Sequence, residues 1–227
     1  MKRVVFLSTI PSLTPLFTNI AKETLPDVEV FHLVDELIRN EVVTQNRIPA
    51  AVYQRMGEHL VACENTGADA VVVTCSSIAP CIGVAPWLVD IPVMRVDEAM
   101  AEEAVEMGHR IGIIATVESA VQPTRELLEA VAGKMGKQPV IDSRVCDPGA
   151  YQAMLDGQAG LHDEIVAREI VNCMEDHDVL VLAQVSMMTA LEKLPPESRK
   201  IPVLSSPGPA MRKLKEVLWK GEEKDEL

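Results

Sequence analysis

A cysteine lies where a strand is expected to end. Cys75 follows the apolar run at residues 70–73 and Thr74, and Ser76 and Ser77 come directly after it. Between a strand and a helix, the helix dipole and free backbone N–H groups would lower the pKa of the thiol. Ser76 or Ser77 would then cap that helix or donate to a bound oxyanion. The pattern predicts a reactive thiol, and the alternative is a small buried hydrophobic residue, as most free cysteines are.

The other four cysteines have weaker claims to chemistry. Cys63 and Cys173 fall in amphipathic segments and Cys81 in an apolar one, which favours core packing. Cys146 follows a strand in a turn-rich segment, where it would approach a ligand or cover a sheet edge. An odd number of scattered cysteines is typical of free thiols in a reducing compartment. No His or Cys spacing matches a metal site, so we expect no metal.

Short apolar runs alternate with amphipathic stretches along the whole chain. Continuous apolar runs are typical of parallel strands buried on both faces, so the pattern predicts an α/β fold. Expected helices include residues 50–64, 163–175 and 210–220. The expected strands cover residues 4–8, 28–33, 70–74, 92–96, 110–115, 139–143, 179–183 and 202–204.

These strands form two sets of four with nearly equal spacing. Thr9 and Cys75 are 66 positions apart, and Thr116 and Gln184 are 68 apart. The fourth strand of each set opens with Ile-Pro-Val. The duplication predicts two pseudosymmetric lobes, each a four-stranded parallel sheet flanked by helices. We place the first lobe at residues 1–97, the second at 98–207, and a C-terminal helix at 208–227 that joins the first.

Ligands of open parallel sheets bind outside the carboxyl ends of the strands, so we expect a cleft between the lobes. Small polar residues and one thiol close the strands there. They are Ser8, Thr9, Cys75, Ser76, Ser77, Thr116, Gln184 and Ser186.

Charge and missing motifs exclude several classes of function. The chain has 21 Lys and Arg against 34 Asp and Glu, a net charge of −13, so nucleic acid and anionic membranes are poor partners. A small carboxylate remains possible, because a few backbone N–H groups bind one locally. No strand is followed by G-x-G-x-x-G or a P-loop, and we expect no cofactor. No signal or membrane-spanning segment is recognised, so we expect a cytoplasmic protein. We also expect a homo-oligomer.

In this order and spacing, Thr-Cys-Ser at 74–76, RIGIIAT at 110–116, DVLVLAQVSM at 178–187 and IPVLSSPGP at 201–209 resemble the aspartate/glutamate/hydantoin racemase superfamily. The resemblance covers nearly the whole chain. It implies two α/β lobes and cofactor-free proton transfer between two cysteines on opposite faces of a substrate α-carbon. Thr116 and Ser119 are similar to the family's carboxylate-binding turn, with Glu118 where glycine is usual. Ser8, Thr9 and Ser12 are the first-lobe counterparts. Val185 and Ser186 directly follow the second catalytic position, and the resemblance implies that all five residues bind the substrate.

Cys75 matches the first family cysteine, whereas the second falls on Gln184. An amide is no general acid or base near pH 7, although it donates hydrogen bonds to an oxyanion. Ser186, a water or Cys146 would then supply the second proton, or the reaction needs only one proton-transfer residue. Arylmalonate decarboxylases, which are similar to these racemases, work with one cysteine. They keep the cysteine of the second lobe, whereas this chain keeps that of the first. Maleate isomerases are also similar in fold and use a cysteine as nucleophile.

Three functions follow from this resemblance. The leading one is a cofactor-independent racemase, epimerase or isomerase on a small carboxylate such as an amino acid, a hydantoin or a dicarboxylic acid. The second is a one-cysteine decarboxylase or lyase on a malonate-like acid. The third is a non-catalytic protein that binds a small anion, against which the retained Thr-Cys-Ser element argues.

Overall fold

The fold consists of two compact α/β units. The computed structural model describes residues 1–45 and 47–220. Unit 1 comprises Met1–Val96 and Pro207–Leu227, and unit 2 comprises Asp97–Ser206. Asp97 and Pro207 thus fall in the unit opposite to the one we expected. The C-terminal helix α9 covers Pro207–Leu218, and residues 221–227 of the helix predicted at 208–227 lie outside the described residues.

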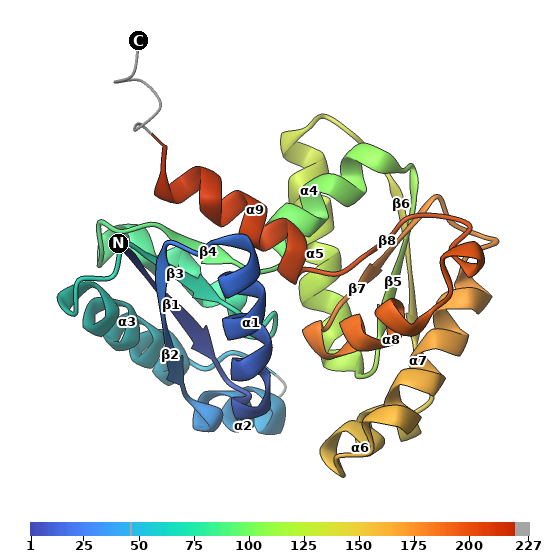
Figure 1. Cartoon of the computed structure of the whole chain (residues 1–227), viewed down its shortest axis with the longest axis horizontal. Helices are drawn as coiled ribbons and strands as arrows, with labels where there is room; N and C mark the ends of the chain where they lie inside the picture. Colours follow the sequence, from blue (N-terminus) through green and yellow to red (C-terminus); the bar gives the residue numbers. More distant parts are fainter. Residues whose placement is uncertain (46, 221–227) are drawn as a thin grey trace. The chain divides into compact units, whose positions relative to one another are not determined.

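Unit 1 contains a four-stranded parallel sheet in the order β2-β1-β3-β4 (Figure 1). Its strands are β1 Lys2–Ser8, β2 Val28–Val34, β3 Ala70–Val73 and β4 Val93–Arg95. Its other helices are α1 Thr14–Thr24, α2 Glu36–Gln45, α3 Ala50–Asn65 and the 3-10 helices η1 Pro11–Leu13 and η2 Ala79–Trp87.

Unit 2 repeats this arrangement in the order β6-β5-β7-β8. The strands are β5 Arg110–Ala115, β6 Val140–Val145, β7 Val179–Leu182 and β8 Val203–Leu204. The helices are α4 Glu98–Met107, α5 Val121–Lys134, α6 Gly149–Leu155, α7 Ala159–Cys173, α8 Met188–Lys193 and the 3-10 helices η3 Glu118–Ala120, η4 Val185–Met187 and η5 Pro196–Ser198. The predicted fold class, two four-stranded parallel sheets flanked by helices, is confirmed.

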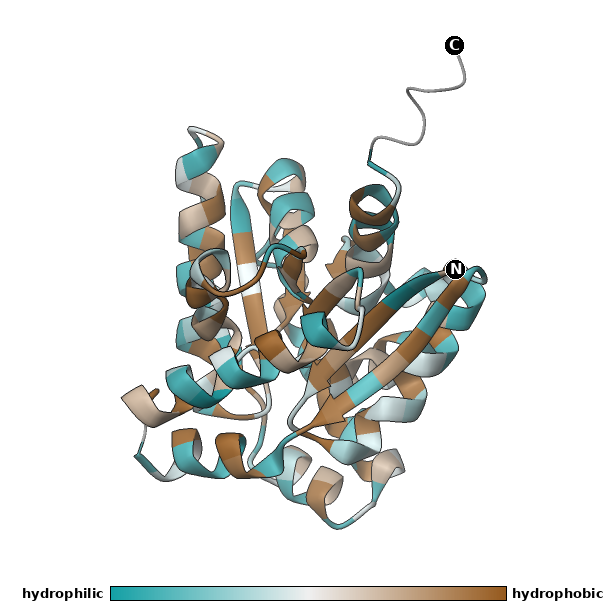
Figure 2. Cartoon of the chain, turned by 90° about the vertical axis from the view of Figure 1, so that its left-hand side faces the viewer, coloured by the Kyte–Doolittle hydropathy of each residue, from teal (hydrophilic) through white to brown (hydrophobic). Residues whose placement is uncertain are grey.

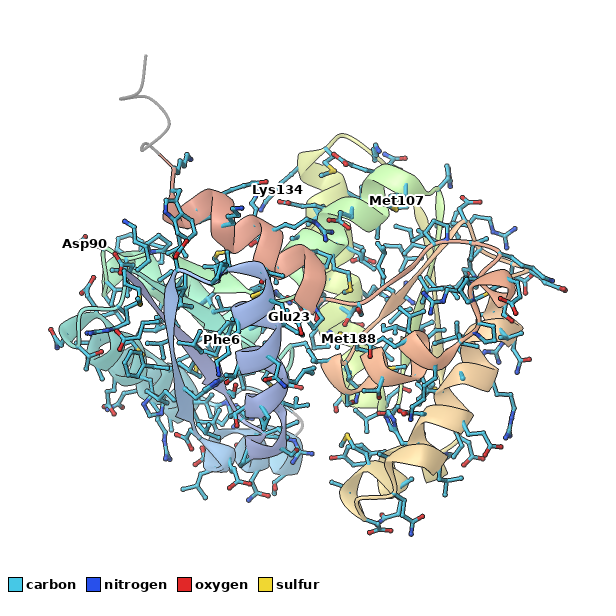
Figure 3. The ribbon with its side chains drawn as sticks, viewed as in Figure 1. Phe6, Glu23, Asp90, Met107, Lys134 and Met188 are labelled. Atoms are coloured by element: carbon cyan, nitrogen blue, oxygen red, sulfur yellow. The ribbon has the colours of Figure 1, made fainter. Side chains whose placement is uncertain are left out.

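Helices cover both faces of each sheet, which is why the central strands are apolar throughout (Figure 2). In β1, Val5 and Leu7 pack in the cluster that contains α3, whereas Phe6 stacks on Phe17 of α1. Phe6 lies fully buried inside unit 1, while Asp90 is at the surface (Figure 3). The edge strands β2 and β6 are only partly buried, since one side of each has no neighbouring strand.

Corresponding backbone hydrogen bonds relate the two sheets residue by residue. The N–H of Thr74 donates to the carbonyl of Leu7 at 3.0 Å, and the N–H of Ala183 donates to Ile114 at 2.9 Å. Counting onward from Leu7 and Ile114, Thr9 corresponds to Thr116. Counting onward from Thr74 and Ala183, Cys75 corresponds to Gln184.

Gly112 lies at the centre of β5 under close-packed side chains. A Cβ there would lie 2.5 Å from Cδ2 of Leu180 and 2.9 Å from Cδ2 of His177. We therefore expect Gly112→Ala to lower the free energy of unfolding by about 1–3 kcal/mol in urea denaturation, because overpacking strains the core. Gly133 of α5 is the matched control, since a Cβ there meets no heavy atom within 4 Å. Gly133→Ala should raise stability by up to about 1 kcal/mol, and an equal loss in both variants would contradict this account.

Candidate functional site

Two hydroxyl groups join the carboxyl ends of β1 and β3 in unit 1. Because Leu7 pairs with Val73, Ser8 lies beside Thr74, and their hydroxyl oxygens are 2.8 Å apart. The Thr74 hydroxyl also donates to the carbonyl of Leu7 at 3.3 Å. Ser8 Oγ is then the donor to Thr74, since a hydroxyl has a single hydrogen. One residue further along come Thr9 and Cys75. We call Ser8, Thr9, Thr74 and Cys75 the unit 1 cluster.

The hydroxyl group of Thr9 is buried and makes no hydrogen bond to the described residues. Its side chain is 2% exposed, and Oγ1 has no hydrogen-bond partner among the described residues. Burying a hydroxyl without a partner costs about 1–3 kcal/mol. The unit 1 cluster therefore holds an unsatisfied polar atom next to the strand end that carries the thiol.

Cys75 is the one cysteine that is not fully buried; the other four are buried in the structure. Its carbonyl accepts hydrogen bonds from the N–H groups of Ile78 and Ala79, which closes a turn directly after β3. The 3-10 helix η2 follows this turn, so the expected α-helix start and its dipole are not found there. Proline at 80 and at 86 accounts for the difference, because proline lacks the N–H that a regular helix needs.

Burial makes the remaining thiols poor nucleophiles. It raises the pKa of Cys63 to about 11, and together with the nearby Cys75 it raises the pKa of Cys81 to about 12. Burial and the charge of Glu169 raise the pKa of Cys146 to about 12, and the same two causes raise that of Cys173. Cys146, the expected alternative thiol, is packed in the core of unit 2.

The predicted serines of unit 1 differ in exposure. Ser76 and Ser77 are half-buried in the turn after Cys75, whereas Ser12 lies exposed in η1. Ile78 is the N-cap residue of η2 and makes no side-chain cap hydrogen bond, so neither Ser76 nor Ser77 occupies the N-cap position of that helix.

Asp35 is a charged residue at this sheet end that the sequence analysis missed. It directly follows β2, and its Oδ2 lies 2.6 Å from Nε of Arg55 and 2.7 Å from Nε2 of His59. Burial would raise the pKa of the carboxyl, but the hydrogen bond from His59 and the charge of Arg55 hold it below its ordinary value. These pairs anchor α3 to the end of β2. A lone acid after a strand was the only sequence signal.

In unit 2, Gln184 and Thr116 bind each other through two hydrogen bonds. The backbone N–H of Thr116 donates to Oε1 of Gln184 at 2.6 Å. The Nε2 of Gln184 donates to Oγ1 of Thr116 at 2.8 Å. Thr116 is buried and Gln184 half-buried, and we call this pair the unit 2 cluster. The thiol position and the carboxylate-turn position of the resemblance are thus in direct contact.

The other predicted residues of unit 2 surround this pair in sequence. Glu118 and Ser119 are exposed in η3, so the Glu118 carboxylate is solvated. Val185 is buried and Ser186 half-buried in η4. The structure thus joins Gln184 to Thr116 by direct bonds and leaves Ser119 at the surface.

A buried carboxylate fixes the helix that follows Gln184. Asp163 of α7 accepts hydrogen bonds from Thr189 at 2.7 Å and from His162 at 3.0 Å, and its Oδ2 lies 2.5 Å from Nζ of Lys193. Burial would raise the pKa of Asp163, but these partners, Lys193 first, hold it below its ordinary value. Because Thr189 and Lys193 belong to α8, Asp163 holds that helix against α7.

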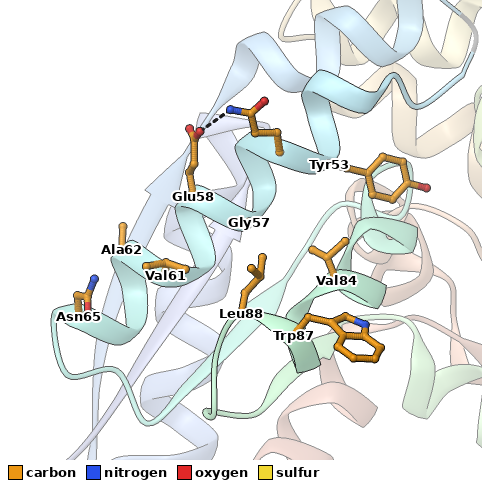
Figure 4. Close-up of a pocket in the computed structure, with 10 residues that line it drawn as sticks. Tyr53, Gly57, Glu58, Val61, Ala62, Asn65, Val84, Trp87 and Leu88 are labelled. Carbon is orange, nitrogen blue, oxygen red and sulfur yellow. Dashed lines mark hydrogen bonds between the residues drawn. The ribbon is translucent and has the colours of Figure 1, made fainter.

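A groove of about 720 Å³ lies elsewhere on unit 1, between α3 and η2 (Figure 4). Apolar side chains line most of it, including the exposed Trp87 and Leu88. None of the predicted site residues lines it. Among residues 1–45 and 47–220, no group of three or more His, Cys, Asp or Glu is placed to hold a metal ion. No helix in the same part of the chain is long and apolar enough to cross a membrane.

The duplicated α/β units, with a thiol after β3 and an amide at the corresponding position after β7, define a class of two-lobed proteins. The Asp/Glu/Hydantoin racemase family model matches residues 8–214. The chain belongs to this family. A search of curated proteins by sequence gives no match.

Solved structures share the fold at low sequence identity. Allantoin racemase from Klebsiella pneumoniae is 18% identical with a TM-score of 0.73, over 97% of this chain and 89% of its own. Glutamate racemase isoform RacE1 from Bacillus anthracis is 19% identical with a TM-score of 0.66, over 97% of this chain and 83% of its own. Unliganded arylmalonate decarboxylase is 14% identical with a TM-score of 0.59, over 97% of this chain and 94% of its own.

The corresponding threonines should respond differently to loss of their hydroxyls. Thr116→Val removes the acceptor of Gln184 Nε2 and should lower the free energy of unfolding by about 1–2 kcal/mol. Thr9→Val removes a hydroxyl that has no partner, so stability should stay unchanged or rise by up to about 1 kcal/mol. Urea denaturation without added ligand measures both. A loss at Thr9 as large as that at Thr116 would contradict the assigned contacts.

Proposed function

We propose that this protein is a cofactor-independent enzyme of the racemase, epimerase or isomerase type that acts on a small carboxylate through the thiol of Cys75. The observation that carries the proposal is the position of Cys75, a partly accessible thiol at the carboxyl end of a central parallel strand, while the other four cysteines are buried. Membership of the racemase family supports the reaction class.

The unit 1 cluster supplies polar groups for the substrate carboxylate. Thr9 offers a buried hydroxyl that has no hydrogen-bond partner within residues 1–45 and 47–220, and ligand binding would remove the cost of leaving it unpaired. Ser8 is already hydrogen-bonded to Thr74 and holds the strand ends together. We assign carboxylate contacts to Thr9, Ser76 and Ser77, with Ser12 further out.

In unit 2, the family resemblance supports a role for Gln184 as a hydrogen-bond donor. Thr116 holds its carboxamide by two bonds, and one of these uses one N–H of Nε2. The second N–H of Nε2 would donate to an oxygen of the substrate enediolate. Ser119, Val185 and Ser186 are the further substrate contacts that we assign to this unit.

The proposed chemistry is proton transfer at the carbon next to the carboxylate. The Cys75 thiolate takes the α-proton and becomes a thiol, and the electron pair of the C–H bond moves into the carboxylate to give an enediolate. Return of a proton from Cys75 restores the original face. Inversion requires a proton on the opposite face, for which Ser186 or a water is the donor in this proposal.

Decarboxylation is the second candidate, favoured by the amide at 184. A malonate-like acid would lose CO2, and the electron pair of the broken C–C bond would form the same enediolate. The Cys75 thiol then protonates one face, and its thiolate regains a proton from water. This reaction needs one proton donor, which matches a chain whose second catalytic position holds a glutamine bound to Thr116.

Cys75 should be the first cysteine to react with iodoacetamide at neutral pH. Burial raises the pKa of the other four thiols and shields them, whereas Cys75 is partly exposed. Peptide mass spectrometry after limited labelling identifies the site, and butanoate should slow the reaction. Cys75→Ser is the control that should remove the fast phase. Faster labelling of Cys146 or Cys81 would contradict the assignment.

Exchange in D2O tests the mechanism. A substrate or a close analogue should acquire deuterium much faster on the face served by Cys75 than on the opposite face, where Ser186 or a water is a weaker proton donor than a thiol, and NMR with a chiral reference distinguishes the two faces. Cys75→Ala should lower the exchange rate at least about 100-fold, since it removes the general acid and base. Gln184→Cys would add slow exchange on the other face. Fast racemisation of an α-amino acid by the unchanged protein would show that another group transfers the second proton.

A further inference from the structure

The side chain of Gln184 fills the position where the unit 2 turn would hold a ligand group. Its carboxamide oxygen accepts a hydrogen bond from the Thr116 N–H at 2.6 Å, and its Nε2 donates to the Thr116 hydroxyl oxygen at 2.8 Å. A carboxamide and a carboxylate have the same planar shape, and each offers an oxygen to a backbone N–H. Gln184 therefore makes, within the chain, the contacts that a small carboxylate or amide would make with Thr116.

In unit 1, no side chain among the described residues makes the corresponding contact with Thr9. Thr9 corresponds to Thr116, and its buried hydroxyl lacks the partner that Gln184 gives to Thr116. Cys75 corresponds to Gln184. Its side chain ends at Sγ and carries no carboxamide that could bind Thr9 as Gln184 binds Thr116. The same backbone thus has one threonine satisfied by its own chain and one that is not.

We infer that Gln184 is a specificity-determining residue that keeps a ligand carboxylate from binding Thr116. A carboxylate that binds Thr116 would have to displace the carboxamide, and two hydrogen bonds of a half-buried group would be lost. Resting on the proposed function, this inference narrows the substrate class. For the racemase, epimerase or isomerase reaction, the substrate is then an acid whose single carboxylate is bound through unit 1 and whose remainder carries no second carboxylate.

Chemical rescue tests whether Gln184 acts as an internal ligand. Gln184→Ala should lower the melting temperature and leave a space shaped for a carboxamide beside Thr116. Acetamide should then raise the melting temperature of this variant by about 2–4 °C relative to its effect on the unchanged protein, because it binds the folded state. Equal effects of acetamide on both proteins would overturn the inference.

Two controls isolate the cavity. Gln184→Met loses the same hydrogen bonds but keeps a side chain of similar length, so acetamide has no space and should give no extra stabilisation. Gln122→Ala removes a glutamine whose amide binds Glu126 on the surface of α5, at 2.8 Å, and acetamide should have no specific effect there. Rescue of either control to the same extent as Gln184→Ala would also overturn the inference.

Protection of Cys75 in the unchanged protein tests the substrate class without any variant. Butanoate and succinate share a four-carbon chain and differ by one carboxylate. Butanoate should protect Cys75 from iodoacetamide at a concentration at least about tenfold lower than succinate, which is the cost of one displaced hydrogen-bonded group. The measurement is made in high salt, because a net charge of −13 repels a dianion more strongly. Gln184→Ala should reduce the ratio.

The outcomes separate this inference from the function on which it rests. Protection by succinate at the same or a lower concentration than butanoate would overturn the inference and leave the proposed function standing. Failure of every carboxylate to protect Cys75 would overturn the proposed function and the substrate class together. Rescue of Gln184→Ala by acetamide would still support the internal ligand in that case.

Discussion

The parallel pairing of β1 with β3, and of β5 with β7, determines which residues are neighbours at the carboxyl ends of the two sheets. Leu7 lies opposite Val73 and Ile114 lies opposite Leu182, so the residues two positions further on are neighbours in each unit. A shift of one residue would turn every side chain of the strand to the opposite face and bury the wrong set. Because the central strands are buried on both faces, their apolar side chains hold this register, and the polar residues that follow them are placed as a consequence.

The two units share one backbone arrangement but differ in the hydrogen bonds of the threonine after the first strand of each sheet. In unit 2 the N–H and hydroxyl of Thr116 are both bound to a neutral amide. In unit 1 the equivalent hydroxyl of Thr9 is buried without a hydrogen-bond partner in the part of the chain that the structure describes. An unsatisfied buried group destabilises the folded state, and such groups persist where a ligand satisfies them or function requires them. The asymmetry between the units is therefore energetic as well as chemical.

The sequence was sufficient to predict the strands because their signal is local. All eight expected strands are present, with ends that differ by at most two residues, and the Ile-Pro-Val repeat marked the duplication. The bond between Gln184 and Thr116 was beyond prediction, because it depends on a side-chain conformation across 68 positions. Asp35 was missed for the same reason, since its partners Arg55 and His59 lie on another element. The helix expected after Cys75 was wrong because proline made it a 3-10 helix.

An amide at position 184, where the resemblance to the family implies a thiol, would change the balance of charge in the proposed reaction. A second thiolate would add negative charge near an enediolate that is already negative, whereas an amide adds none and offers an N–H. The amide cannot carry a proton between substrate and solvent, so the gain in oxyanion stabilisation comes with the loss of one proton donor. A single accessible thiol and a fixed amide are therefore better suited to proton delivery on one face than to interconversion of two equal enantiomers. We therefore give particular weight to the one-cysteine reaction as the second candidate, although the family of this chain is named for racemases.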